Sequence, residues 1–176
     1  MRLGLKNDEI RLVDYATEWN DEFRRVKKEI MENTKLEENR IEHIGSTAIK
    51  GMLAKPILDI LIGVDDINNV DHSIISELKT IGFYRLKVER PREIVFAKFT
   101  DKTYEEKTHF IHIVEYQKEL WNNLIFFRDY LNANENERQK YLEIKLDYLK
   151  QSSIGILEYT DHKEEFVKNI IKKRSC

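Results

Sequence analysis

Hydrophobic residues follow two different spacings along the chain, and the change comes near residue 116. Before that point, short runs rich in β-branched and aromatic residues alternate with helical segments, and such runs are typical of strands. The expected strands cover residues 10–13, 41–44, 57–64, 83–88, 94–100 and 108–115. After residue 116 the apolar residues recur with helical spacing, which predicts helices for the rest of the chain.

The expected helices cover residues 18–36, 66–80, 120–131, 134–151 and 161–172. Thr17 is the expected N-cap of the first helix, Gly82 is placed to end the second, and Asn134 is placed to cap the fourth. Strands followed by a run of helices predict an α+β domain with a helical C-terminal third.

Composition and charge narrow the class of protein without identifying it. A length of 176 residues favours one domain, residues 1–176, with a core of its own. Thirty basic against thirty-two acidic residues leave a net charge of −2, so there is no strong nucleic-acid signal and no basic field toward a membrane. The longest apolar run, residues 57–64, is far short of the roughly 20 residues of a membrane span. With one cysteine, an intramolecular disulfide is excluded, and we expect a cytoplasmic protein of open oligomeric state.

The candidate chemistry starts at Gly45, Ser46 and Thr47, directly after the expected strand at residues 41–44. Glycine lets the backbone turn tightly, and amides at the start of a helical turn, with two hydroxyl groups nearby, can bind an anion. Such triplets also cap ordinary helices. The segment is not a Walker loop, because the Gly-x-x-x-x-Gly-Lys-Ser/Thr order is absent.

Asp59 lies inside the expected strand at residues 57–64, where alternation places it on the same face as Ile57 and Leu61. A carboxylate among such neighbours is costly to bury unless it is paired, hydrogen-bonded or bound to a cation. Two interpretations follow. Asp59 lies at the edge of the strand or pairs with a basic side chain such as Lys55, or it holds a metal ion beside the phosphate site.

Three histidines are weaker candidates for residues of the site. His43 is close enough in sequence to Ser46 to organise the turn that follows it. His109 and His112 stand three apart, but on a strand they face opposite sides of the sheet, so we expect no shared metal ion. His112 lies among apolar residues, which is typical of a hydrogen-bonded core histidine.

The helical third adds basic residues. Tyr141 and Lys145 are four apart and share one face of a helix, and Arg128 lies in the preceding helix. Arg128 and Lys145 could supply positive charge to a phosphate. A solvated face with local ion pairs explains the pattern equally well.

Together these residues resemble the GrpB family, a group of small bacterial proteins within the nucleotidyltransferase-fold superfamily. The match lies in residues 42–48, at Gly51 and in residues 55–60. It continues at residues 109–114, 127–131 and 141–145, and it covers nearly the whole chain.

The resemblance implies a nucleotidyltransferase-like mixed β-sheet flanked by helices. In active members of the superfamily the Gly-Ser turn holds a triphosphate, and acids on two strands hold two Mg²⁺ ions. Leu61 occupies the place of the second carboxylate, and leucine offers no oxygen to a hard cation. The expected ligand-binding residues are His43, Gly45, Ser46, Thr47, Lys55, Arg128, Tyr141 and Lys145. Asp59 is the expected Mg²⁺ ligand and, with His112, the expected catalytic pair.

Two functions follow from the resemblance. The first is binding of a nucleotide or another phosphorylated ligand with Mg²⁺, followed by nucleotidyl transfer at an incomplete metal site. The second is a catalytically inactive nucleotide- or coenzyme-sensing or protein-interaction module, which Leu61 favours. Similar domains occur fused to dephospho-coenzyme A kinase, which points to nucleotide or coenzyme metabolism. A purely structural domain ranks last.

Overall fold

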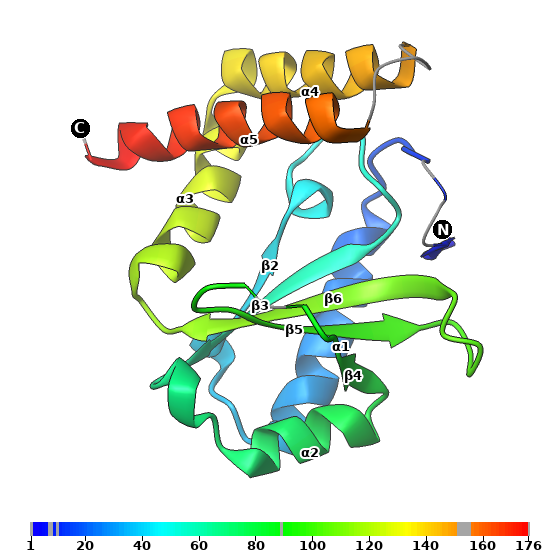
Figure 1. The fold of residues 1–176 in the computed structure, drawn as a ribbon, viewed down its shortest axis with the longest axis vertical. Coiled ribbons are helices and arrows are strands. Elements are labelled where there is room, and N and C mark those ends of the chain that lie inside the picture. The colour runs from blue at the N-terminus through cyan, green and yellow to red at the C-terminus, as the bar shows by residue number, and fades with distance from the viewer. Residues whose placement is uncertain (1, 7–8, 10, 89, 151–155, 176) are drawn as a thin grey trace.

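The computed structural model describes residues 2–6, 9, 11–88, 90–150 and 156–175. Its centre is one mixed sheet with the strand order β2-β3-β6-β5-β4, and β1 pairs with the start of β6 (Figure 1). β3 and β6 run parallel, and the other neighbours are antiparallel. The strands are β1 (Leu5–Lys6), β2 (Ile41–Ile44), β3 (Leu58–Val64), β4 (Phe83–Arg85), β5 (Ile94–Phe99) and β6 (Glu106–Glu115).

Five α-helices surround this sheet in the described part of the chain: α1 (Glu18–Thr34), α2 (His72–Thr80), α3 (Glu119–Ala133), α4 (Glu135–Lys150) and α5 (Ile156–Lys172). In Figure 1, α4 and α5 lie side by side beyond one end of β2, and α3 runs from them along the sheet. The predicted α+β class, the mixed sheet and the helical C-terminal third are confirmed. None of the helices in these described ranges is long and apolar enough to cross a membrane.

The face of the sheet under α1 and α2 is an apolar core. Ile60 and Ile62 of β3 and Ile111 of β6 are fully buried against α1 residues such as Val26 and Ile30. Ile60 and Ile62 are two apart and Ile111 pairs with Ile60, so all three project to the same side of the sheet. Each buried aliphatic side chain contributes about 1.5–3 kcal/mol relative to an exposed one, which makes this face the main source of stability.

The opposite face is only partly covered. Leu61 of β3 and Val114 of β6 pack under Trp121 of α3, at one end of the sheet. At the other end, Tyr141 of α4 stacks on Phe166 of α5, with ring centroids 5.2 Å apart. The candidate site lies between these two apolar clusters.

The largest differences from the predicted strands are at residues 10–13 and 83–88, and the other strand boundaries lie within two residues of the prediction. Of the strand expected at residues 10–13, residue 10 lies outside the described residues, and Val13 forms an isolated bridge with Ala54 instead. The strand expected at residues 83–88 ends at Arg85, although the N–H of Leu86 still donates to the carbonyl of Val95 at 2.8 Å.

The starts of α2 and α5 differ from the prediction, and so does the cap of α1. α5 begins at Ile156 rather than at residue 161. Thr17 has helical backbone angles and makes no side-chain capping hydrogen bond, so it does not cap α1 as predicted. α2 begins at His72 rather than near residue 66, because the Asp71 carboxylate accepts the N–H of Ser73 and caps the helix there. Gly82 follows α2 with φ of +89°, as its expected role at the helix end requires.

Candidate functional site

The turn after β2 and the beginning of β3 form one structural unit. Ile44 pairs with Asp59 in the antiparallel register, which places the next residue, Gly45, against the Asp59 side chain. Gly45 has φ 71° and ψ −170°, a conformation that strongly favours glycine, and a Cβ atom there would lie 2.3 Å from Oδ2 of Asp59. Only glycine fits, so the predicted turn and the predicted carboxylate depend on each other.

A cavity of about 490 Å³ opens beside this unit, on the face of the sheet that α3 only partly covers. It brings together six of the predicted residues, namely Ser46, Thr47, Lys55, Asp59, His112 and Lys145. Its apolar wall includes Phe110 and Val95 from the sheet and Val88 from the segment before β5. The cavity therefore combines polar groups with an apolar surface, as small-molecule sites do.

Five of the side chains that line the cavity are lysine or arginine. Lys107, Arg90 and Lys163 join the predicted Lys55 and Lys145, and the first three are not among the residues predicted for the site. Burial lowers the pKa of Lys55, and the nearby charge of Lys163 lowers it further. These residues come from five separate segments, so only the tertiary fold reveals the group. Asp59 is the one carboxylate among the described residues that line the cavity.

His112 lies between two carboxylates. Its Nδ1 is 2.5 Å from Oε1 of Glu93, and its Nε2 is 3.4 Å from Oδ1 of Asp59. Burial alone would lower the pKa of His112, but the hydrogen bonds and charges of Asp59 and Glu93 raise it to about 9. His112 is therefore positively charged at neutral pH.

Lys145 joins α4 to the Gly-Ser turn. Its Nζ donates to Oγ of Ser46 at 2.6 Å and to the carbonyl of Leu53 at 2.7 Å, and it lies 4.6 Å from the ring centroid of Tyr141. Burial lowers the pKa of Lys145 to about 7, with a contribution from the charge of Lys163. Tyr141 does not line the cavity. It is buried behind the turn, where burial raises its pKa to about 12 in spite of a hydrogen bond with Ser46.

Two further predicted ligand-binding residues lie behind the turn rather than on the cavity wall. The buried His43 stacks on Phe23 of α1, and its Nε2 is 2.9 Å from Oγ1 of Thr47. Arg128 of α3 donates to the Glu42 carboxylate at 2.6 Å and to the carbonyl of His43 at 2.8 Å. Both side chains fix the position of the turn. A direct role for either in ligand binding stays a prediction.

The residues present fit a two-metal centre poorly. Leu61 is fully buried beneath Trp121, and the described ranges contain no group of three or more His, Cys, Asp or Glu side chains that could hold a metal ion. Mg²⁺ prefers six oxygen ligands, and the wall of the cavity offers it the carboxylate of Asp59, which already faces His112.

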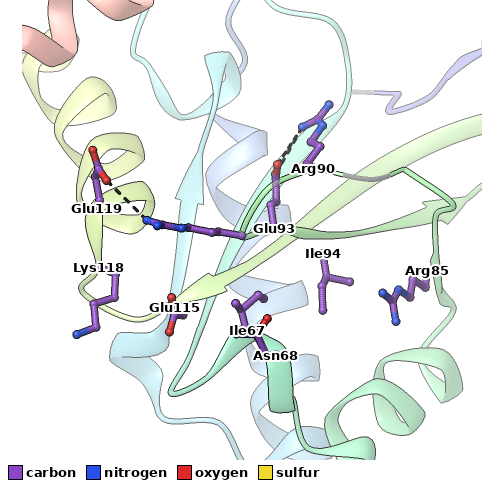
Figure 2. A pocket seen from close by; sticks show the side chains of 10 residues that line it. Ile67, Asn68, Arg85, Arg90, Glu93, Ile94, Glu115, Lys118 and Glu119 are labelled. Atoms are coloured by element: carbon purple, nitrogen blue, oxygen red, sulfur yellow. Dashed lines mark hydrogen bonds and ion pairs between the residues drawn. The ribbon is translucent and has the colours of Figure 1, made fainter.

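A second, more open cavity of about 740 Å³ shares Arg90 with the first, and Figure 2 shows the side chains that line it. Arg90 lines both cavities, and Glu93, which contacts His112, lines the second. In Figure 2, Arg90 points toward Glu93, and their ion pair measures 3.3 Å. Glu115, at the end of β6, lines this second cavity and not the first. Arg90 and Glu93 therefore form the boundary between the two.

Sequence comparison identifies the relatives of this chain. The profile of the family described as GrpB protein matches residues 9–173. The chain belongs to the GrpB family. The glutamate-rich protein GrpB of Alkalihalophilus pseudofirmus is 39% identical over 97% of this chain and 99% of its own. The predicted family resemblance is confirmed.

Solved structures support the fold prediction. The crystal structure of the conserved protein GrpB from Enterococcus faecalis aligns with a TM-score of 0.76 and 24% identity, covering 94% of this chain and all of that one. A structure of the Cid1 poly(U) polymerase with MgGTP bound aligns with a TM-score of 0.51 and 16% identity, covering 75% of this chain and 43% of that one. At these identities the alignments show the fold alone, and that fold is nucleotidyltransferase-like.

Proposed function

We propose that this GrpB-family protein binds a small molecule through its phosphate groups, and that a nucleotide or a phosphorylated coenzyme precursor is the class of ligand. The observation that carries the proposal is the convergence of five lysine or arginine side chains on one cavity beside the Gly-Ser turn. Phosphate oxygens accept charge-assisted hydrogen bonds from such groups, which are the stronger hydrogen bonds of proteins.

The residues of the cavity have three roles, which are to bind phosphate, to hold the turn and to pack against the organic part of the ligand. Lys55 and Lys163 supply charge to the phosphates, and Lys145 supplies charge and also holds the hydroxyl of Ser46. Thr47 is almost fully buried and bonds His43, so its main role is to keep the turn in place. The apolar wall with Phe110 gives the base or the organic tail of the ligand a surface to pack on.

Binding without turnover is the better supported form of this proposal. Leu61 leaves a two-metal mechanism without its second carboxylate, and the single described carboxylate on the cavity faces a histidine. Nucleotidyl transfer is the second candidate. The retained Asp59 beside the Gly-Ser turn favours it, as does the fold shared with the Cid1 poly(U) polymerase.

The predicted Mg²⁺ stays a prediction. Among the described residues on the cavity, Asp59 is the group that could hold an ion, and the ligand would have to supply most of the remaining oxygens. Such an ion would arrive with the nucleotide rather than reside in the protein. The chain itself supplies basic side chains to the phosphates, and these need no metal.

Isothermal titration calorimetry with a panel of ribonucleotides and phosphorylated coenzyme A precursors tests the proposal. At least one panel member should bind, and its dephosphorylated counterpart should not. Replacement of one lysine, Lys163→Met, should weaken binding about tenfold, because it removes one charge-assisted contact. The matched control is Lys79→Met, which removes an exposed lysine from α2 and should leave binding unchanged.

Two outcomes would contradict phosphate binding at this site. One is the absence of binding by every phosphorylated member of the panel. The other is binding that Lys163→Met leaves at the wild-type affinity. Mass spectrometry of the same mixtures separates the two candidate functions, since released pyrophosphate or a nucleotidylated product would establish transfer.

A further inference from the structure

We propose that Ser46 is an activated nucleophile whose general base is the amine of Lys145, and that it accepts a phosphoryl group from a phosphoanhydride bound in the cavity. The donor is the phosphorylated ligand of the proposed function, on which this inference rests. A single transfer to the protein itself is not turnover, and it requires no acceptor substrate.

Lys145 holds the hydroxyl of Ser46 in a chain of hydrogen bonds. Nζ of Lys145 lies 2.6 Å from Oγ of Ser46 and 2.7 Å from the carbonyl oxygen of Leu53. The carbonyl can only accept, so it takes one N–H of the amine. In the neutral amine a lone pair remains to accept the hydroxyl proton of Ser46, and Tyr141, which also hydrogen-bonds Ser46, can donate to the same oxygen. A serine–lysine pair requires this contact between nucleophile and base.

The surroundings of Lys145 favour the neutral amine. Lys145 is 3% exposed, and its hydrogen-bond partners in the described ranges are a hydroxyl and a carbonyl, neither of which is charged. Burial and the charges of Lys163 on α5 and Lys55 before β3 lower the pKa of Lys145 to about 7, although the charge of Asp59 opposes them. The amine can therefore act as a base at neutral pH, which an ordinary lysine cannot.

Ser46 is the more accessible of two neighbouring hydroxyl groups. It is half-buried and lines the cavity together with Lys55 and Lys163. Thr47 is only 1% exposed, and its Oγ1 is 2.9 Å from Nε2 of His43. The reaction is therefore expected at Ser46 and not at Thr47.

In the transfer, Oγ of Ser46 attacks the terminal phosphorus of the donor. The new Oγ–P bond forms as the anhydride P–O bond breaks, and the rest of the donor leaves with the electron pair of that bond. The hydroxyl proton passes to Nζ of Lys145, which becomes an ammonium ion beside the phosphoserine. Lys55 and Lys163 line the same cavity and offset the negative charge of the transferred group.

Labelling with a fluorophosphonate, followed by peptide mass spectrometry, tests the nucleophile without a nucleotide. We expect the label on Ser46, at a rate that rises from about pH 6 and levels off above about pH 8 as Lys145 loses its proton. Ser46→Ala should abolish the label. The matched control Ser76→Ala removes an exposed hydroxyl group from α2 and should leave the rate unchanged.

The variant Lys145→Arg separates a base from a fixed charge. Arginine keeps the positive charge but is not deprotonated in proteins, so the labelling rate should fall about 100-fold, the scale of general base catalysis. Circular dichroism checks that the fold is kept. Incubation of the wild-type protein with ribonucleoside triphosphates and Mg²⁺, and with inorganic pyrophosphate, should place a phosphoryl group on Ser46 with at least one of these donors.

The outcomes separate this inference from the proposed function. Labelling of Ser46 no faster than that of Ser76, or a Lys145→Arg variant that reacts at the wild-type rate, would overturn the inference and leave the proposed function standing. Donors that bind but leave Ser46 unmodified would do the same. If Lys145→Arg does not fold, the wild-type pH profile decides, because a rate that is constant from pH 6 to 8 or still rising above it excludes Lys145 as the base. No binding by any phosphorylated probe would overturn both.

Discussion

The two faces of the sheet shift the pKa of a histidine in opposite directions. His109 and His112 are three apart on β6, and strand alternation sends them to opposite faces. His109 is buried on the face of α1 and α2, where burial lowers its pKa to about 4 despite the nearby charge of Glu22. The pKa of His112, which lies on the other face, is raised to about 9 by the carboxylates of Asp59 and Glu93.

The difference lies in the partners rather than in the degree of burial. His109 has one carboxylate close by, Glu22 at 3.2 Å from Nε2, and its Nδ1 is 2.8 Å from the hydroxyl of Thr108. Burial and the charges of Lys98 and Arg25 lower the pKa of His109, so the neutral form is favoured. His112 has a carboxylate at each nitrogen, so the charged form is favoured. One face is thus a neutral core that stabilises the fold, and the other holds fixed charge beside a cavity.

The largest loss of stability is expected when a charge is placed inside the apolar part of the cavity face. Leu61→Asp puts a carboxylate under Trp121, where Leu61 is fully buried. We expect a loss of about 4 kcal/mol in the free energy of unfolding, because the carboxylate has no partner there. Urea denaturation measures the loss. A volume-conserving control, Leu61→Met, should cost less than about 1.5 kcal/mol. A Leu61→Asp protein of wild-type stability that takes up Mg²⁺ would contradict the account.

The next largest effect concerns the turn that shapes the cavity. Gly45→Ala places a Cβ atom 2.3 Å from the Asp59 carboxylate and strains the backbone, so it should cost about 3 kcal/mol and abolish ligand binding. Gly51→Ala is the matched control. Gly51 also has positive φ, 74°, but no atom lies within 4 Å of its added Cβ, so the cost should be about 1 kcal/mol. Equal losses of stability in the two variants would show that the contact with Asp59 is unimportant.

The two histidines should give pH dependences of stability with opposite signs. The raised pKa of His112 means that its stabilisation is complete below about pH 6.5 and is lost as the pH rises through about 9. The lowered pKa of His109 means that stability falls as the pH drops from about 6.5 toward 4, since the unfolded chain then binds the extra proton.

Unfolding free energies of His112→Gln and His109→Gln, each compared with wild type across this range, measure the two contributions. The two pKa differences each correspond to about 3 kcal/mol across the full range. Stability differences that do not vary with pH, or that vary in the same direction, would remove the contrast between the faces.

The smallest expected effect belongs to Lys145. Its pKa of about 7 means that the charge is present at about pH 6 and mostly lost by about pH 8. The variant Lys145→Met carries no charge at any pH, so the ratio of the variant's dissociation constant to that of wild type should fall severalfold between these values. Titration of the ligand itself cancels in this ratio. A ratio that stays constant would show that Lys145 does not contribute its charge to binding.

Much of the scaffold could be predicted from local pattern. The alternation in residues 57–64 predicted that Asp59 and Leu61 share a face, and the structure places both on the α3 side. The same rule separated His109 from His112. His43 was expected to organise the turn, and its contact with Thr47 confirms this.

The electrostatic partners could not be predicted, because they are distant in sequence. Glu93 reaches His112 across the β5–β6 hairpin, and Lys163 reaches the cavity from α5, beyond two other helices. Arg128 matched a family motif, but its contacts with Glu42 and the backbone of His43 lie across 86 and 85 residues of sequence. Spacing identifies the face on which a strand residue lies, whereas tertiary packing decides what stands opposite.

The most direct test of the central claim, that the cavity face carries a fixed positive charge at His112, is an NMR titration of the histidine ring resonances. The account predicts that His112 is still protonated at about pH 8, with a pKa of about 9, while His109 is neutral above a pKa of about 4. Titration of both rings near 6.5, the value of an unperturbed histidine, would contradict it.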